Sequence, residues 1–359
     1  MLKIFCTKKL AEKLPTKPTK CQEETDLFDS WYANTTTIGR SAVVVAVCGA
    51  TRFGFVLFGI KKNQWKEIPN MILDGIRKTL RAYGVKEKLV EAYAPEGAPL
   101  EMYAATDRKG TAQSSMVVKL LNSARFHKMP SELLPLPLTR SLNLDIMGIT
   151  SGSSTTPYEE MMKALEARYG EYPVAVPAFV LNVEMDMERF IVRRTLTVPA
   201  SATFEELHRM LQAAMQWQNY HMHDFTIPGE EELRLVATDE EAEELYGQSW
   251  KLDSAVTLSE YLKPGMRFLY RYDFGDGWEA LIEVKEFRTD YDRYEPTCSE
   301  CDRSAPPEDV GGVDGYLNFL DAMADENHPE HDEMKEWVGF RWSKEPNIRM
   351  INSSLRHVL

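Results

Sequence analysis

The chain lacks long apolar runs, a signal peptide and a basic excess of charge. Its longest apolar run, Ala42 to Cys48, is far shorter than the roughly 20 residues that a membrane-spanning helix needs. The first residues, Met1 to Cys6, lack the apolar core of a secretory signal. These absences predict a soluble, cytoplasmic protein with no membrane partner.

Cysteines are few, and the common catalytic signatures are missing. Five cysteines are scattered along the chain, and an odd, scattered set is not typical of a disulfide framework. No G-x-S-x-G, Walker A, dinucleotide or H-E-x-x-H motif occurs. Asp273-Phe274-Gly275 spells a kinase motif, but no glycine-rich phosphate loop or His-Arg-Asp loop precedes it. The sequence therefore argues against a serine hydrolase and a protein kinase.

The net charge of −13 is distributed unevenly between the two halves of the chain. Residues 1–176 hold 24 Lys+Arg against 18 Asp+Glu, a balance of +6, whereas residues 177–359 hold 18 against 37, a balance of −19. Phosphate backbones repel such an acidic half, so we do not expect it to bind nucleic acid. A basic protein partner suits it better.

A length of 359 residues predicts two domains. Residues 128–177 are rich in proline and serine, with one helical pattern near Tyr158 to Tyr169, and we interpret them as a linker. Residues 1–127 then form a small α+β domain, because a hairpin pattern over Ser41 to Phe58 precedes amphipathic helices.

The sequence of residues 178–359 predicts a second α+β domain. Two strands precede a helix whose capping box is Thr203 with Glu206, and a second box, Thr257 with Glu260, begins a short helix. A strong hairpin over 266–287 follows, and helices end the chain. This order predicts a β-grasp-like mixed sheet with one packed helix and C-terminal helices.

Two dense motifs carry a family resemblance. They are Tyr270 to Glu279 and Pro306 to Gly312, supported by Tyr220 to Phe225 and by His328 to His331. On these residues the segment 178–359 resembles the plasmid pRiA4b ORF-3-like family, also labelled as a mobile-element passenger protein. The resemblance implies a fold but no established reaction.

The first half resembles a different family, and the second half departs from its own. Residues 1–125 look like a bacterial domain of unknown function, carried by motifs such as Trp31 to Asn34. In the second half, relatives usually place a histidine where this chain has Ala280, and often cysteines where it has Ala305 and Val310. A family site that used those groups is therefore in doubt.

A zinc site is one candidate. Cys298-x-x-Cys301 and His328-x-x-His331 together supply two thiolates and two imidazoles, which suffice for tetrahedral zinc. The alternative is a pair of surface thiols and a histidine-rich helix start. We favour the alternative, because 26 residues separate the pairs and the family cysteines near 305 and 310 are absent.

A carboxylate cluster is the second candidate. Paired carboxylates can hold Mg²⁺ or divide acid and base roles, and the catalytic candidates are Asp273, Asp276, Glu308 and Asp309. A structural interpretation is favoured. Asp276-Gly277 predicts a type I′ turn with left-handed backbone at both residues, Asp273 caps the turn, and Glu308-Asp309 caps the next helix.

Histidines and a tryptophan form the third candidate. His221 and His223 would share one face of a strand, near His208, and could act as a metal or acid–base pair. We favour packing roles for these histidines. Trp278 is a candidate binding platform or core residue.

We expect a non-catalytic binding or accessory module, associated with mobile elements and with zinc as its candidate cofactor. The alternative is a metal-dependent hydrolase that uses the Asp/Glu/His groups. Both functions require that the bend near Asp273 and the segment near Glu308 converge in space.

Overall fold

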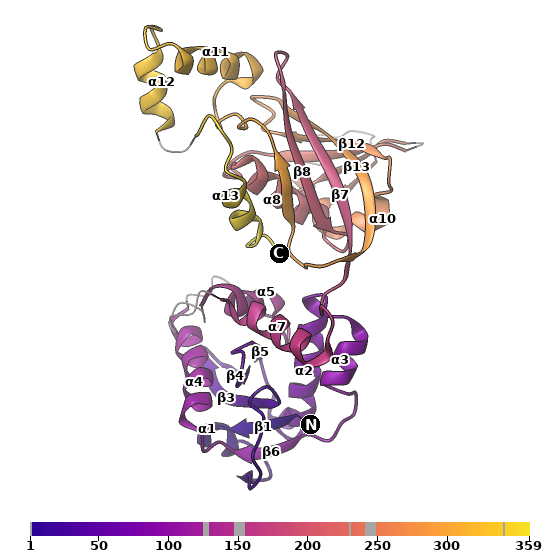
Figure 1. Cartoon of the computed structure of the whole chain (residues 1–359), viewed down its shortest axis with the longest axis vertical. Coiled ribbons are helices and arrows are strands. Elements are labelled where there is room, and N and C mark those ends of the chain that lie inside the picture. The colour runs from indigo at the N-terminus through magenta and orange to yellow at the C-terminus, as the bar shows by residue number, and fades with distance from the viewer. Residues whose placement is uncertain (1, 125–128, 147–154, 230, 241–248, 340–341) are drawn as a thin grey trace. The chain divides into compact units, whose positions relative to one another are not determined.

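A computed structural model of the chain describes residues 2–124, 129–146, 155–229, 231–240, 249–339 and 342–359. The chain divides into two compact units, Met1–Ala175 and Val176–Leu359, and both mix helices with sheet (Figure 1). The predicted α+β class is confirmed. Within the described residues, no helix is both long enough and apolar enough to cross a membrane.

The first unit is built on a six-stranded sheet with the strand order β2-β6-β1-β3-β4-β5. The β1–β3, β1–β6 and β2–β6 pairs are parallel, and the β3–β4 and β4–β5 pairs are antiparallel. The bounds of the strands are β1 Lys3–Cys6, β2 Thr19–Lys20, β3 Ser30–Ile38, β4 Ser41–Cys48, β5 Gly54–Phe58 and β6 Glu101–Ala104. Strands β4 and β5 are the apolar hairpin that the sequence predicts.

Helices cover this sheet, and the segment interpreted as a linker supplies some of them. They are α1 Lys8–Ala11, a 3₁₀ turn Lys62–Glu67, α2 Ile68–Ala82, α3 Glu87–Tyr93, α4 Arg108–Ser123, α5 Leu136–Ser141, a π turn Leu142–Ile146 and α7 Pro157–Tyr169. Helix α7 buries Met161 and Leu165, and Tyr158 stacks on Tyr83 of the same unit. The structure therefore places the described part of 128–175 inside the first unit, because α7 is amphipathic and buries its apolar face there.

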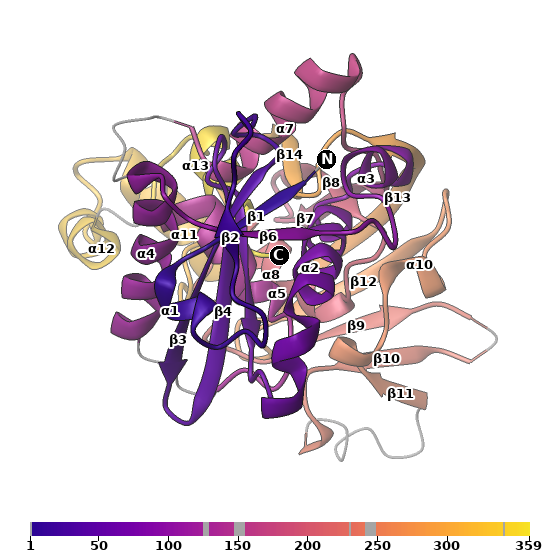
Figure 2. The same cartoon turned by 90° about the horizontal axis from the view of Figure 1, so that it is seen from below.

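The second unit contains an eight-stranded mixed sheet with the order β11-β10-β9-β12-β13-β7-β8-β14. Among the described strands of this second sheet, β10 and β11 form the one parallel pair, and the other pairs are antiparallel. The bounds of the strands are β7 Val176–Asp186, β8 Ile191–Pro199, β9 His223–Ile227, β10 Leu233–Val236, β11 Ser249–Leu252, β12 Arg267–Tyr272, β13 Trp278–Tyr291 and β14 Thr297–Cys301. Figure 2 shows β9, β10 and β11 following one another at one edge of the sheet.

Helix α8, Phe204–Met215, packs on one face of this sheet, as the sequence predicts. Its Thr203–Glu206 capping box is formed in both directions, which satisfies two of the amides left free at a helix start. Helix α13, Ile348–Leu355, lies on the same face (Figure 1). The remaining helices of this unit are a 3₁₀ turn Asp253–Ala255, α10 Leu258–Tyr261, α11 Gly312–Ala324 and α12 His331–Val338.

Candidate functional site

The bend between β12 and β13 is shaped by Asp273. Its Oδ1 accepts hydrogen bonds from the amides of Gly275 and Asp276, at 3.0 and 3.3 Å. Asp273 and Gly277 have positive φ angles, 53° and 71°, whereas Asp276 does not. The bend is therefore a wider loop than the predicted two-residue type I′ turn. The predicted capping role of Asp273 is confirmed. Its side chain also explains the wider loop, because it binds the backbone amides of Gly275 and Asp276 inside the bend.

The Pro306–Gly312 segment lies against this bend. Glu308 accepts a hydrogen bond from the Tyr272 hydroxyl at 2.5 Å through Oε1, and one from the Gln218 amide at 3.0 Å through Oε2. Asp276 Oδ2 accepts from the Gly311 amide at 3.1 Å. The predicted convergence of the two motifs is thus confirmed.

Glu308 and Asp309 do not cap α11, contrary to the favoured prediction. The N-cap of α11 is Gly311, which has no side-chain cap, and Asp276 from the bend binds its amide instead. Gly312 has a φ of 69°, and a Cβ there would lie 2.8 Å from the Asp276 carbonyl oxygen. Glycine is required here because the two backbones approach closely and the dihedral is left-handed.

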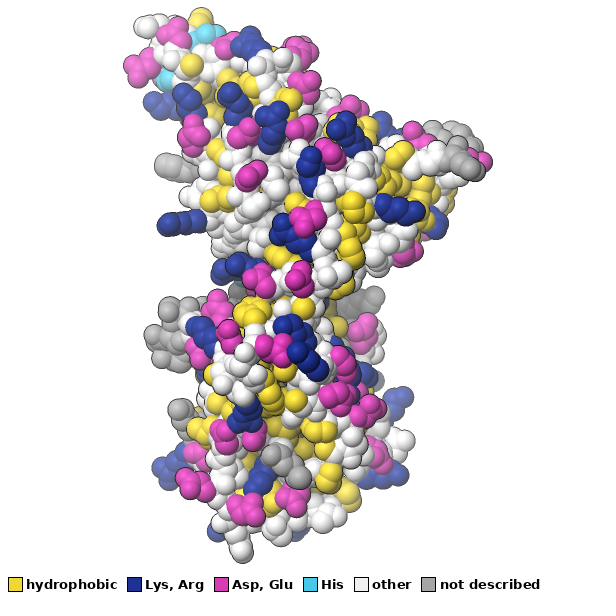
Figure 3. All heavy atoms as spheres, turned by 45° about the vertical axis from the view of Figure 1, so that its right-hand side comes forward, with side chains coloured by type: hydrophobic (Ala, Val, Ile, Leu, Met, Phe, Trp, Pro, Cys, Tyr) yellow, Lys and Arg dark blue, Asp and Glu magenta, His cyan; other side chains and the backbone are white. Residues whose placement is uncertain are grey.

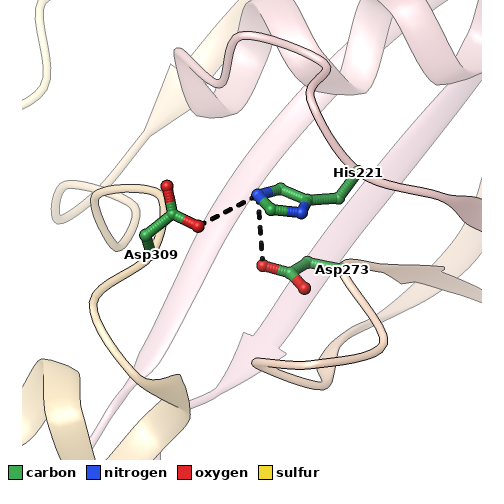
Figure 4. A group of neighbouring side chains, drawn as sticks. All are labelled: His221, Asp273 and Asp309. Atoms are coloured by element: carbon green, nitrogen blue, oxygen red, sulfur yellow. Dashed lines mark ion pairs between the residues drawn. The ribbon is translucent and has the colours of Figure 1, made fainter.

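Three side chains from separate segments meet at this junction. His221 Nε2 lies 3.1 Å from Asp309 Oδ1 and 3.5 Å from Asp273 Oδ2, and Figure 4 shows the ring nitrogen directed between the two carboxylates. One ligand atom from each residue lies within 4.8 Å of the others. Asp273 is buried and Asp309 is exposed. An imidazole with two carboxylates is a donor set that divalent cations such as Zn²⁺ and Mn²⁺ accept.

His221 and His223 belong to different clusters. Strand β9 begins at His223, so the alternation of a strand does not apply to His221. The His223 ring stacks on that of His208 with centroids 3.4 Å apart and an interplanar angle of 6°. Its Nε2 lies 2.9 Å from Oδ2 of the buried Asp253. The favoured packing interpretation therefore fits His223 and His208, whereas His221 faces the acidic pair.

Tyr272 links these two clusters. Its ring lies 5.9 Å from that of His221 and 6.2 Å from that of His208. Burial, together with the hydrogen bond to Glu308, raises the pKa of Tyr272 well above that of free tyrosine. The phenol therefore stays protonated and donates to Glu308, which fixes the Pro-Glu segment against β12.

Trp278 lies in the core. Only 2% of its surface is exposed, and its ring lies 6.4 Å from that of Trp217. Of the two roles expected for Trp278, the structure therefore supports the core role more than that of an open stacking platform.

The predicted cysteine and histidine pairs are not brought together. Among the described residues, the one group of three or more His, Cys, Asp or Glu close enough to share an ion is the His221 cluster. Cys298 and Cys301 lie on β14, where Cys298 is buried, and the His331 Nδ1 is occupied by the carbonyl of Ala322 at 2.8 Å. His328 Nδ1 accepts from the Glu330 amide.

Thiol reactivity provides a test of these placements. Burial raises the pKa of Cys6 to about 12 and that of Cys298 to about 11, and it also raises the pKa of Cys48. We expect native protein to be alkylated first at the half-buried Cys21, and at these three thiols only after denaturation, because the thiolate is the reactive form. Timed iodoacetamide labelling with peptide mass spectrometry measures this order. Labelling of native Cys298 as fast as Cys21 would contradict the placement of β14.

Some residues of the junction carried no signal in the sequence. Asp253 and Asn219 contact the stacked histidines, yet neither lies in a recognisable motif. Asn219 contacts His208 on α8 from 11 residues away, and Asp253 contacts His223 on β9 from 30 residues away, so both contacts depend on the tertiary fold. Tyr272 was part of an identifying motif, but its bond to Glu308 was not predicted.

The comparisons with known proteins agree with the two-unit division. The family model described as "Plasmid pRiA4b ORF-3-like protein" matches residues 177–348, and the model described as "Domain of unknown function (DUF6933)" matches residues 3–160. A relative, the "Uncharacterized protein y4hQ" of Sinorhizobium fredii (strain NBRC 101917 / NGR234), is 36% identical over 162 residues, which are 44% of this chain and 79% of the relative.

One solved structure is also similar. The crystal structure of a protein of unknown function, MM3350 from Methanosarcina mazei Go1, has a TM-score of 0.43 and 27% sequence identity. The match covers 48% of this chain and 96% of that one. These names carry no reaction and no ligand.

Proposed function

The C-terminal domain makes this chain a member of the plasmid pRiA4b ORF-3-like family, and from this premise we propose that the domain is a binding module organised by a divalent cation. The observation that carries the proposal is His221. Its Nε2 is buried and makes no hydrogen bond, although two carboxylate oxygens lie 3.1 and 3.5 Å away. An imidazole nitrogen directed between two carboxylate oxygens is a geometry suited to a cation held by the three groups.

The electrostatics support the same site. Asp273 and Asp309 bring two negative charges beside one imidazole, and Asp273 is only 6% exposed. Its Oδ1 is held by two backbone amides, so Oδ2 keeps a fixed direction toward His221. A cation of charge +2 would neutralise the two carboxylates, and three protein ligands would leave coordination positions for a bound partner.

Binding is favoured over catalysis because two of the four catalytic candidates have structural roles. Glu308 uses both carboxylate oxygens to hold Tyr272 and Gln218, and Asp276 holds the Gly311 amide. Neither carboxylate is placed to exchange protons freely with a substrate. A general base must reach the proton it removes without first breaking such bonds.

A metal-dependent hydrolase is the second candidate, and one observation favours it. Asp309 is 66% exposed and, with Gln218 and Tyr220, borders a small pocket of about 120 Å³. A water on the cation could be activated beside such a pocket.

We further propose that the module acts in the cytoplasm as an accessory to mobile elements. The acidic half of the chain, with its balance of −19, suits a basic protein partner. Figure 3 shows basic and acidic side chains interspersed on one view of this domain, so the attraction would arise from the excess of acidic groups rather than from a surface of one sign.

Metal titration tests the proposal. We expect metal-free full-length protein to bind one Zn²⁺ or Mn²⁺, measured by calorimetry. His221→Ala and Asp309→Asn should each weaken binding at least about 100-fold, because loss of a direct ligand exceeds the effect of losing a second-shell partner.

The matched control is Asp314→Asn, the same charge change at an exposed carboxylate five residues away. Equal metal affinity of Asp309→Asn and Asp314→Asn would refute the site. Metal-dependent hydrolysis of a p-nitrophenyl ester or phosphodiester, lost in His221→Ala, would favour the hydrolase.

A further inference from the structure

A second pocket lies on the face of the C-terminal sheet opposite α8. It has a volume of about 320 Å³ and is formed by β9, β10, β12, β13 and the bend between the last two. On these strands Phe225, Phe268 and Tyr270 point into the core toward α8, so their neighbours along each strand point to the other face. One row of paired residues crosses all four strands there: Val236, Asp224, Arg271 and Glu279.

The pocket has two arginines around one buried carboxylate. Asp224 is 2% exposed and accepts a bidentate pair of bonds from Arg271, at 3.1 Å from Nε and 2.9 Å from Nη2. Its Oδ2 also accepts from Nη2 of Arg234. Two guanidinium groups therefore share one carboxylate, which leaves one positive charge in excess beside Asp224.

Arg234 lacks an acceptor for part of its guanidinium group. Only 9% of its surface is exposed, and its buried Nε–H has no hydrogen-bond partner. A buried donor without an acceptor costs about 1–3 kcal/mol, and more when the group is charged. Arg234 lines the pocket, so an acceptor placed there would remove this cost once the guanidinium shifts slightly toward it.

The other residues that line the pocket limit the kind of ligand that can carry this acceptor. Met222 and Phe274, each 47% exposed, supply apolar walls, and the Arg271 guanidinium lies 5.7 Å above the Phe274 ring. Glu279 borders the same pocket and makes no ion pair with Arg271, its partner across the strands. This second carboxylate disfavours ligands with more than one negative charge.

We propose that this pocket binds a small carboxylic acid with an apolar or aromatic body. The carboxylate would accept from the unbonded end of the Arg271 guanidinium, a planar match that arginine makes well, and from Arg234 after a small shift of that side chain. The apolar body would lie against Met222 and Phe274. None of His221, Asp273 and Asp309 lines the pocket, so this site is separate from the proposed cation site.

Benzoate is the probe, measured against full-length protein by calorimetry with EDTA present, so that the proposed cation site is empty. We expect saturable binding of benzoate in the millimolar range or tighter. Benzamide, which has the same shape and no charge, and inorganic phosphate, which carries more charge, should bind at least about 10-fold more weakly. Equal binding of benzoate and benzamide, or no saturable binding of benzoate, would overturn the proposal.

Three variants distinguish binding of benzoate in this pocket from a non-specific effect of the protein's net charge on its affinity. Arg234→Gln should weaken benzoate at least about 10-fold, whereas Arg267→Gln, the same change at an exposed arginine of β12, should leave it unchanged. Glu279→Gln removes the opposing charge at an exposed position and should tighten benzoate roughly 2- to 5-fold, a readout that remains if Arg234→Gln fails to fold. Weakening by Arg267→Gln as large as that by Arg234→Gln, or no gain with Glu279→Gln, would count against the site.

Discussion

Arg194→Ala is expected to lower the free energy of unfolding of the C-terminal domain by about 3–5 kcal/mol. Arg194 is 1% exposed and donates from Nε to the Ala214 carbonyl at 3.0 Å. Its Nη1 reaches the carbonyls of Arg193, Asp302 and Arg303, at 2.7, 2.8 and 3.0 Å. One side chain thus joins the end of α8 to the segment after β14. Its loss leaves the carbonyls of Ala214, Asp302 and Arg303 to find other partners, whereas the Arg193 carbonyl keeps its bond from the Asp302 amide.

Urea unfolding followed by tryptophan fluorescence measures this effect, because five of the seven tryptophans lie in the C-terminal unit. The matched control is Arg193→Ala. Arg193 is the preceding residue, but its side chain is 48% exposed and pairs with Glu184 at the surface. We expect a loss of no more than about 1 kcal/mol there. If both variants lost the same stability, the buried contacts of Arg194 would not be what holds α8 to β14.

The second large effect is a loss of folding stability at acidic pH that is caused by His208. This ring is 2% exposed, its Nδ1 lies 2.9 Å from the Tyr270 hydroxyl, and its Nε2 lies 2.8 Å from Asn219 Oδ1. Because Asn219 Oδ1 can only accept, we assign the ring proton to Nε2. Burial, followed by the stacked His223, lowers the pKa of His208 to about 3.

The sign follows from comparing the folded and unfolded states. Above the usual histidine pKa of about 6.5, His208 is neutral in both states and contributes no pH dependence. Between about pH 6.5 and 3 the unfolded chain binds a proton that the folded domain does not bind. Stability therefore falls by about 1.4 kcal/mol per pH unit as the pH drops through this window.

The measurement compares wild type with His208→Gln, which cannot titrate. Other groups also make acid unfolding pH-dependent, so the informative quantity is the difference between the two slopes of unfolding free energy against pH. We expect the variant to be flatter by about 1.4 kcal/mol per unit between about pH 6 and 4, even if it is less stable at neutral pH. Parallel slopes would mean that His208 gains a proton in the folded domain as easily as in the unfolded chain.

Local signals predicted the elements well. Both capping boxes, at Thr203 and Thr257, form as expected, because each is complete within four residues and needs no distant partner. The hairpin predicted over 266–287 is also present, as β12 and β13. The predicted type I′ turn at Asp276-Gly277 is wrong, because Asp276 does not have a positive φ and the Asp273 side chain binds the amides of Gly275 and Asp276.

The candidate site was predicted in part. The sequence identified its two motifs and the carboxylates in them, and the structure brings these motifs together. It could not separate His221 from His223, because no local pattern shows that β9 begins at His223 and that His221 therefore lies outside the strand. The zinc set of Cys298 and His331 failed to assemble because spacing along a chain does not constrain distance between a strand and a remote helix.

By itself the sequence determined the family, the α+β class, the acidic second half and the helix starts at Thr203 and Thr257, since composition and short-range capping are properties of neighbouring residues. Only the tertiary structure decided that His221 meets Asp273 and Asp309, and that Arg234 on β10 pairs with Asp224 on β9. Those contacts depend on the order of strands in the sheet. Strand order is set by long-range packing of apolar faces, which no local pattern in the chain records.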